Sequence, residues 1–330
     1  MSDYIYDPNQ EAPEPPKKRF RLFDSQREGK GVTKEDAVIT PDLRGFFRSL
    51  KRNFTKLLSV NLLTLVGNFP VLFAILALSG LFKTSYMTPL SGYFGDLRAM
   101  MLLDGARDPA TMAAFGALGI QIENTAMTTT SYVFLALSAL TFLTFGFTKV
   151  GTTYIIRSLI RGRPVFMLSD FRDAIKDNKK QAFFVGILDL FLILLVPINL
   201  VILLETSGSF FGSVLLWSNI LIAIVYFFMR PYIYLQMITF DLKIGKLLKN
   251  SLIFALLGIK GNILALLGFI LLVFMMVLLI FGIGGALLPL GLAIPLVLLF
   301  SLGSFMGDFA AWFKIKAIMI DPQQTSEDED

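Results

Sequence analysis

The chain of 330 residues is 55% hydrophobic and 17% charged, with a formal net charge of +5 and with neither Cys nor His. Soluble domains carry about 25% charged residues, so the long uncharged stretches of this chain exclude an ordinary soluble domain. The missing Cys and His exclude disulfides, thiol nucleophiles, His-dependent hydrolases and His or Cys metal sites.

The two ends of the chain are polar. Residues 1–40 contain four prolines and seven basic residues, the latter all between Lys17 and Lys34. Such a composition cannot bury enough apolar surface to offset chain entropy, so we expect a disordered, basic cytoplasmic tail. It holds no early apolar run, so we expect no cleavable signal peptide. Residues 321–330 are acidic and are predicted to form a second cytoplasmic tail.

Six apolar segments lie between the tails. A helix needs about 20 mostly apolar residues to cross a bilayer core of about 30 Å. The predicted fold is therefore all-α, a polytopic transmembrane helix bundle over residues 41–320. Its six predicted spans are Leu57–Leu81, Tyr132–Phe147, Ala182–Leu204, Phe211–Met229, Ile263–Ile280 and Leu287–Phe305.

The first loop, residues 83–131, is too long for a simple connection. One helical face is formed by Leu90, Phe94, Leu97 and Met101, and Asp108-Pro109 is typical of a helix start. We expect an extracytoplasmic loop with short helices. It either packs over the bundle or forms a lid over an external cavity.

Residues 166–181 look amphipathic. Leu168, Phe171 and Ile175 share one face, and Ser169 or Asp170 can cap the start of a helix. The polar positions hold Arg172, Lys176, Lys179 and Lys180. This pattern predicts an interfacial helix at the cytoplasmic face, with its basic side chains near anionic lipid headgroups; a protein partner is the alternative. Nothing in the sequence indicates nucleic-acid binding.

The basic residues divide unequally between the two sides of the predicted bundle. Twenty Lys and Arg residues fall in residues 41–56, 149–180, 230–260 and 314–316, and three fall in the first outer loop. Cytoplasmic loops collect Lys and Arg. The division therefore predicts that both termini are cytoplasmic.

A short pattern recurs before three of the spans. An apolar residue, Lys, any residue and Asn occur at Leu50–Asn53, Ile175–Asn178 and Ile259–Asn262. Each precedes an odd-numbered span, which is consistent with three helical hairpin repeats. A chance match of residues that are common beside membranes is the alternative.

Four ionisable residues fall within or at the ends of the spans: Asp189, Lys149, Arg230 and Asp308. Charges in a membrane are costly and are often functional. Either the two carboxylates neutralise the two cations inside the bundle, or Asp189 belongs to a proton or substrate site. An intramembrane aspartyl protease is disfavoured, because Phe305-Met306-Gly307-Asp308 lacks the first Gly of that class.

Helix breakers and amides also interrupt the spans. They are Asn61, Asn68, Pro70, Pro197, Asn199, Pro289 and Pro295. Broken helices flank the binding sites of many transporters. Such residues are more commonly tolerated as part of close helix packing in an ordinary bundle.

A polar motif follows the second span and consists of Tyr154, Arg157, Arg161, Gly162, Asp170, Phe171, Lys176, Asn178 and Gln181. Together with Asn61-Leu62-Leu63 and Phe69-Pro70, it resembles the YesL-like membrane proteins, a bacterial family whose domain has no assigned biochemical function. Short members lack the long outer loop and the basic tail. The resemblance implies a bacterial cell membrane and an accessory role, since members often occur beside sugar-uptake systems. It supplies no catalytic residue.

Three classes of function remain. A non-enzymatic accessory or assembly component associated with carbohydrate uptake is favoured, because the chain shows no catalytic constellation and has basic cytoplasmic surfaces. A small-solute transporter with a site near Asp189 is the alternative, and an intramembrane enzyme is a minor one. We expect no cofactor.

Overall fold

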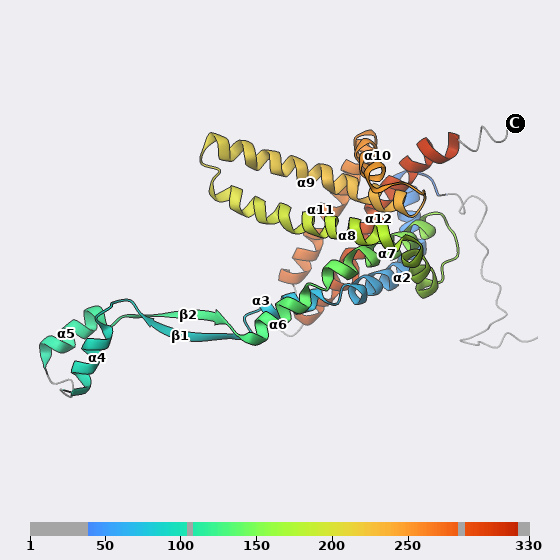
Figure 1. The fold of residues 1–330 in the computed structure, drawn as a ribbon. Coiled ribbons are helices and arrows are strands. Elements are labelled where there is room, and N and C mark those ends of the chain that lie inside the picture. Colours follow the sequence, from blue (N-terminus) through green and yellow to red (C-terminus); the bar gives the residue numbers. More distant parts are fainter. Residues whose placement is uncertain (1–38, 104–107, 283–287, 323–330) are drawn as a thin grey trace, which may run out of the picture. The chain divides into compact units, whose positions relative to one another are not determined.

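The computed structural model describes residues 39–103, 108–282 and 288–322. Apart from the few residues nearest the helices, the two predicted tails lie outside this part of the chain. The described part is a bundle of α-helices with one short two-stranded sheet (Figure 1). The predicted all-α polytopic class is confirmed.

Five helical segments of the described chain are long and apolar enough to cross a membrane, and the number is six if a bent helix pair is counted as one span. The bent pair is α2 (Leu43–Gly67) and α3 (Val71–Leu78). The other spans are formed by α6 (Thr129–Ser138) with α7 (Thr141–Ile160), α8 (Met167–Glu205), α9 (Phe210–Met237), α11 (Ile259–Gly282) and α12 (Leu288–Ile315), which continues into a π-helical turn, Lys316–Ile320.

The break in the first span lies at the amides and proline noted in the sequence. The axes of α2 and α3 differ by 65°. Pro70 has no N–H to continue the helix, and the side chain of Asn68 donates a hydrogen bond to the Thr64 carbonyl at 2.9 Å. Asn68 thus satisfies a carbonyl at the end of α2, and the chain restarts in a new direction.

The outer loop contains a β-hairpin that the sequence analysis did not predict. Strands β1 (Lys83–Pro89) and β2 (Gln121–Met127) pair antiparallel and are mostly exposed. Neither strand buries a continuous face, so neither shows the alternation that marks a half-buried strand. Between them lie two short helices, α4 (Phe94–Leu103) and α5 (Pro109–Leu118).

The predicted start of α5 is confirmed. Asp108 accepts hydrogen bonds from the N–H groups of Ala110 and Thr111, and Pro109 is the first helical residue. A hydrogen bond from the Thr111 hydroxyl, together with these two backbone bonds, lowers the pKa of the Asp108 carboxyl below its usual value.

The predicted interfacial helix at 166–181 is wrong as a separate element. Helix α8 runs without a break for 39 residues, which is about 58 Å at 1.5 Å per residue. That length exceeds a hydrocarbon core of about 30 Å. The basic segment is therefore the first part of the helix that becomes the third span, because no Gly or Pro separates the two.

Several helices extend further than hydropathy predicted. Helices α7, α9 and α12 continue ten or so residues past the predicted ends of their spans, and α10 (Ile244–Leu257) is an additional helix in the 230–260 connection. The extensions carry polar residues that end an apolar stretch in the sequence but do not end a helix. Many of these residues are buried in the bundle.

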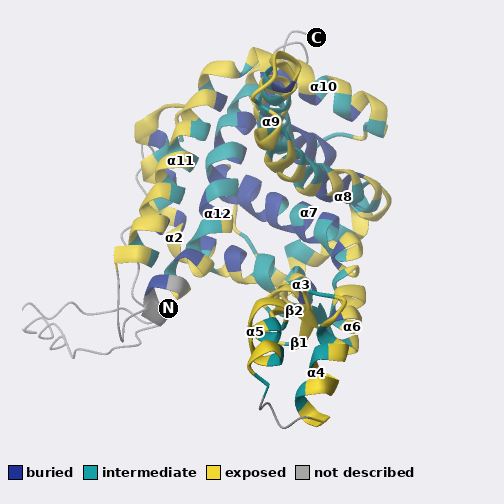
Figure 2. Ribbon diagram, turned by 90° about the vertical axis from the view of Figure 1, so that its left-hand side faces the viewer, coloured by how far each residue is buried: buried dark blue, intermediate teal, exposed yellow. Residues whose placement is uncertain are grey.

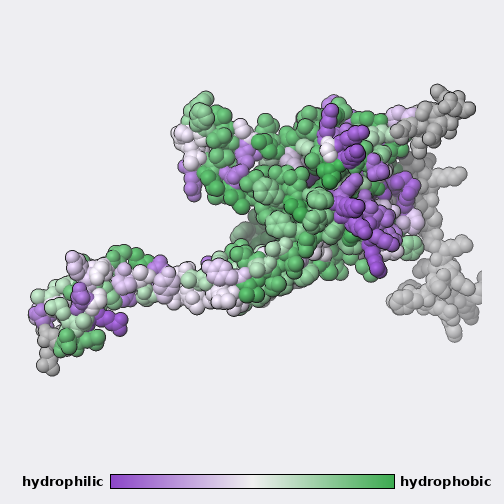
Figure 3. Space-filling model, viewed as in Figure 1, coloured by the Kyte–Doolittle hydropathy of each residue, from purple (hydrophilic) through white to green (hydrophobic). Residues whose placement is uncertain are grey.

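The core lies where α2, α7, α9, α10 and α12 meet (Figure 2). Its fully buried side chains include Leu57, Ile155, Tyr232 and Phe305. Apolar side chains cover much of the surface shown in Figure 3, and hydrophilic ones gather at the end where α7 ends and α8 begins. Such an exposed apolar surface fits a bilayer environment.

Helices α7 and α8 approach unusually closely. A Cβ atom on Gly146 would lie 2.0 Å from the Ala182 carbonyl oxygen, and one on Gly186 would lie 2.3 Å from the Gly146 Cα. Small residues permit this approach of two backbones in a membrane. The contact places the polar residues of α7 and α8 side by side.

Candidate functional site

Asp189, on α8, is the centre of a polar cluster inside the bundle. Its side chain is 1% exposed, and all three of its partners come from α9. One carboxylate oxygen accepts from the Tyr226 hydroxyl at 2.6 Å and from Arg230 Nε at 2.7 Å. The other accepts from the Tyr234 hydroxyl at 2.7 Å. This is the arrangement that the counter-ion interpretation predicts.

The two tyrosines were missed in the sequence, although a signal exists. Tyr226, Arg230 and Tyr234 are spaced four residues apart, which places them on one face of a helix. A carboxylate that receives a charge-assisted bond and two hydroxyl bonds is well satisfied in a region of low dielectric. The cluster therefore holds α8 against α9.

The second predicted pair of charges is arranged differently. Lys149 Nζ donates to the Ser304 hydroxyl at 2.8 Å and lies 5.9 Å from the centre of the Tyr234 ring. Asp308 is 1% exposed, and neither of its carboxylate oxygens has a hydrogen-bond partner among the described residues. The structure thus brings all four predicted charges into the bundle, but it gives an ion pair to only one carboxylate.

Asn61 links the first and last helices. Its amide nitrogen donates to the Leu296 carbonyl at 2.7 Å, and its oxygen accepts from the Ser301 N–H at 3.0 Å. These two backbone groups follow Pro295, which lies inside α12. A side-chain amide thereby bonds to the backbone of α12 within the two turns that follow Pro295. Asn219 makes a similar contact from α9 to the Val196 carbonyl of α8, at 3.2 Å.

Two residues of the family-like motif hold the turn between α9 and α10, residues 238–243. Arg157 donates to the Ile238 carbonyl at 2.7 Å and to the Thr239 hydroxyl at 2.8 Å. Gln181 donates to the Leu242 carbonyl at 2.8 Å. The motif therefore connects α7 and α8 to this turn.

Gly162 and Arg161 complete the end of α7. Gly162 has a φ of +70°, and the N–H of Arg163 bonds to the Ser158 carbonyl at 2.9 Å, as in a Schellman cap. Arg161 lies 5.3 Å from the centre of the Trp312 ring. Partial burial and the nearby Arg163 lower the pKa of Arg161.

Asp170 and Phe171 shape the start of α8. Asp170 accepts a hydrogen bond from the N–H of Phe166, the residue before the helix, at 3.0 Å. The ring of Phe171 lies against Gly151 of α7, where a Cβ atom would be 2.4 Å from the ring. Both residues have clear structural roles.

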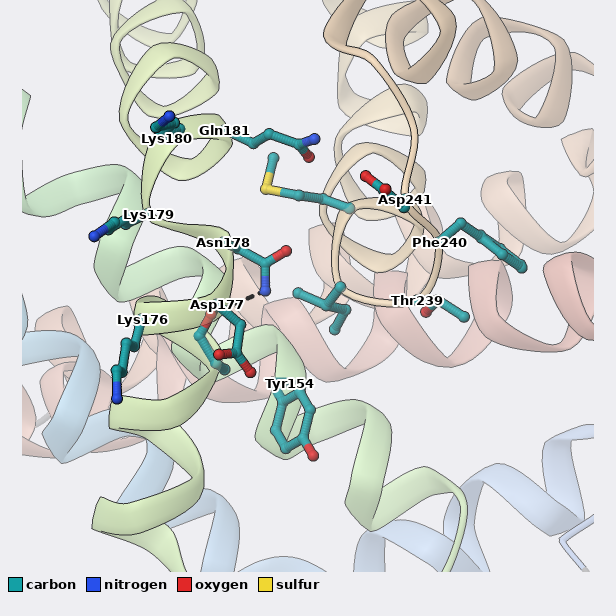
Figure 4. Close-up of a pocket in the computed structure, with 13 residues that line it drawn as sticks. Tyr154, Lys176, Asp177, Asn178, Lys179, Lys180, Gln181, Thr239, Phe240 and Asp241 are labelled. Carbon is teal, nitrogen blue, oxygen red and sulfur yellow. Dashed lines mark hydrogen bonds between the residues drawn. The ribbon is translucent and has the colours of Figure 1, made fainter.

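A hollow of about 600 Å³ opens beside the α9–α10 turn (Figure 4). In Figure 4 Asn178 and Gln181 extend from α8 toward the turn, and the amino groups of Lys176 and Lys179 point away from it. The lining residues are Tyr154, Ala174, Lys176, Asp177, Asn178, Lys179, Lys180, Gln181, Met237, Ile238, Thr239, Phe240 and Asp241. Four of them, Tyr154, Lys176, Asn178 and Gln181, belong to the motif, and Arg157 of the motif bonds to the adjoining turn.

Within the described residues, no group of three or more acidic side chains could hold a metal ion. The chemistry available is that of two places: the charged cluster inside the bundle, and the mixed-charge hollow at the end of the helices. Comparison of the chain with protein-family models, with curated proteins and with solved structures finds no match.

Proposed function

We propose that this multi-pass membrane protein is a non-enzymatic accessory subunit of a carbohydrate-uptake system in a bacterial cell membrane. In this proposal its polar core is structural, and a partner protein binds at the cytoplasmic end of the helices, around the hollow of Figure 4. The satisfied ion pair of Asp189 with Arg230 supports the first part.

The observation that carries the proposal is the position of the motif around the hollow. Arg157 and Gln181 donate hydrogen bonds to the backbone of the α9–α10 turn and so fix its shape. A turn held from two other helices presents a defined surface, and a preformed surface loses little entropy when a partner binds. The link to sugar uptake rests on the resemblance to the YesL-like proteins.

Small-solute transport is the second candidate, and the broken helices favour it. The 65° bend between α2 and α3 resembles the discontinuous helices of transporters. A transport site at Asp189 is not favoured, because both carboxylate oxygens of Asp189 already accept hydrogen bonds from protein side chains. The enzyme alternative has less support, because Asp189 and Asp308 share no hydrogen bond among those described.

A photo-crosslinking amino acid placed at Thr239 or Asp241 tests the proposed partner surface. Both residues line the hollow. In membranes of the source bacterium we expect a covalent adduct with a subunit of a solute-uptake system, identified by mass spectrometry. The matched control is the same amino acid at Trp217 of α9, which is exposed among apolar residues; we expect lipid adducts there.

The outcome that contradicts the proposal is equally specific. Adducts with lipid alone at Thr239 and Asp241, or the same protein adduct at Trp217, would show that the turn does not receive a partner.

A further inference from the structure

Asp308 is the buried ionisable group that the proposed function does not use. Its carboxyl group is 1% exposed, and both oxygens lack a hydrogen-bond partner among the described residues. Asp189, at 1% exposure, receives three hydrogen bonds. An ionised carboxylate without such bonds is very unfavourable in an apolar region, and a neutral carboxyl is much less so. The geometry around Asp308 thus favours the protonated form.

A cation lies one helical turn away. Ser304 and Asp308 are four residues apart on α12, so their side chains share a face about 6 Å apart. Lys149 Nζ bonds to the Ser304 hydroxyl at 2.8 Å. The lysine side chain has several rotatable bonds, so a change of rotamer moves its ammonium group along α12 from Ser304 toward Asp308.

The other charged groups near Asp308 are few. From α9 comes Arg230, which Asp189 of α8 already neutralises. The basic side chains of α2, and Lys260 of α11, are exposed. On α7, Arg157 bonds to the α9–α10 turn and Arg161 lies against Trp312. Lys246 and Lys249 of α10 and Lys316 after α12 are exposed. Among the described helices, Lys149 is therefore the part-buried cation near Asp308 that has no carboxylate partner.

We propose that Asp308 is a proton-binding site in which Lys149 has two positions. In the first, the carboxyl carries the proton and Lys149 bonds to Ser304, as in the structure. In the second, the O–H bond of Asp308 breaks, the proton passes to water, and the ammonium group of Lys149 bonds to the resulting carboxylate. One proton leaves, and one hydrogen bond to Ser304 is replaced by an ion pair within the bundle.

Infrared difference spectroscopy of the full chain in lipid nanodiscs, between acidic and alkaline pH, tests this site. A protonated carboxylic acid has a carbonyl stretch separate from the amide bands. We expect a buried carboxyl signal at neutral pH that Asp308→Asn removes. The double variant Asp189→Asn/Arg230→Gln removes the other buried carboxylate together with its cation, so it should retain the signal. The exposed Asp241→Asn is the matched control and leaves the signal unchanged.

Two further variants keep Asp308, so the proposal can be tested even if the Asp308→Asn protein does not fold. Ser304→Ala removes the other acceptor of Lys149, so the signal should disappear at a pH about one unit or more lower than in the wild type. Lys149→Met removes the cation, so the signal should persist to a more alkaline pH by a similar amount. A wild-type protein without a protonated buried carboxyl at neutral pH overturns the proposal. So does a signal that neither variant moves.

Discussion

At the residue scale, the four intramembrane charges show how far a sequence can be interpreted. Costly charges in apolar segments marked Asp189, Lys149, Arg230 and Asp308 as a group, and the structure places them all inside the bundle. The choice of partner was not predictable. It depends on how α7, α8 and α9 pack together, and hydropathy does not register contacts such as that of Gly146 of α7 with Gly186 of α8.

The pairing of Asp189 can be measured directly. Asp189→Asn leaves Arg230 without its counter-ion, so we expect a loss of about 3 kcal/mol in unfolding free energy. Adding Arg230→Gln should recover part of the loss, because no orphan charge remains. The measurement is denaturant unfolding of the purified protein in detergent.

Tyr226→Phe is the matched control for this cycle. It removes one hydroxyl bond to Asp189 and keeps the ion pair, so it should cost about 1 to 2 kcal/mol. If Asp189→Asn were neutral for stability and the double variant no better, the ion pair would not be what holds these helices.

At the scale of elements, hydropathy located the spans but not their ends. Each of the six predicted spans lies largely in an observed helix or bent pair. The predicted ends were wrong because a polar residue lowers hydropathy without ending a helix, as at Lys149 and Arg157 in α7. The β-hairpin was not predicted, because its strands are mostly exposed and show no apolar face. The predicted repeat of three helical hairpins stays a prediction, because its three asparagines do not make the same contacts. Asn53 and Asn262 donate hydrogen bonds to other helices, whereas the described bond of Asn178 is to its own helix.

The hydrogen bonds of Asn61 between α2 and α12 predict how much the loss of this one side-chain amide destabilises the protein. Asn61→Ala removes two hydrogen bonds to the α12 backbone, so we expect a loss of about 2 to 3 kcal/mol in unfolding free energy. Amide hydrogen exchange should rise most at residues 296–301, where the backbone loses its partner.

The control for this prediction is Ser218→Ala on α9. Ser218 donates only to the Val214 carbonyl of its own helix, so the change should lie within about 0.5 kcal/mol of zero. If exchange at residues 296–301 were the same in Asn61→Ala as in the wild type, the amide would not be what stabilises this part of α12.

At the scale of the whole molecule, the surface and the basic residues point to one arrangement. Large exposed apolar side chains on α8, α9 and α11 fit contact with lipid tails. Twenty Lys and Arg residues fall in residues 41–56, 149–180, 230–260 and 314–316, against three in residues 83–107. The composition of the chain alone therefore supports a multi-pass membrane protein. A partner or a solute does not follow from it, because binding depends on side chains that distant helices bring together, as around the hollow of Figure 4.

The orientation in the membrane is the last prediction. The excess of basic residues places the start of α8 and the α9–α10 turn in the cytoplasm. The native chain has no Cys, so a single introduced cysteine reports its own position. Cysteines at Gly92 and Gly208 should react with an impermeant maleimide added to intact cells, and those at Ser169 and Gly245 should react only after the membrane is opened. All four positions are exposed, and no other group lies within 4 Å of a Cβ at any of the three glycines, so packing cannot mask the reaction. If Ser169→Cys reacted in intact cells, the charge argument would fail. The hollow would then face the outside, where a cytoplasmic partner could not reach it.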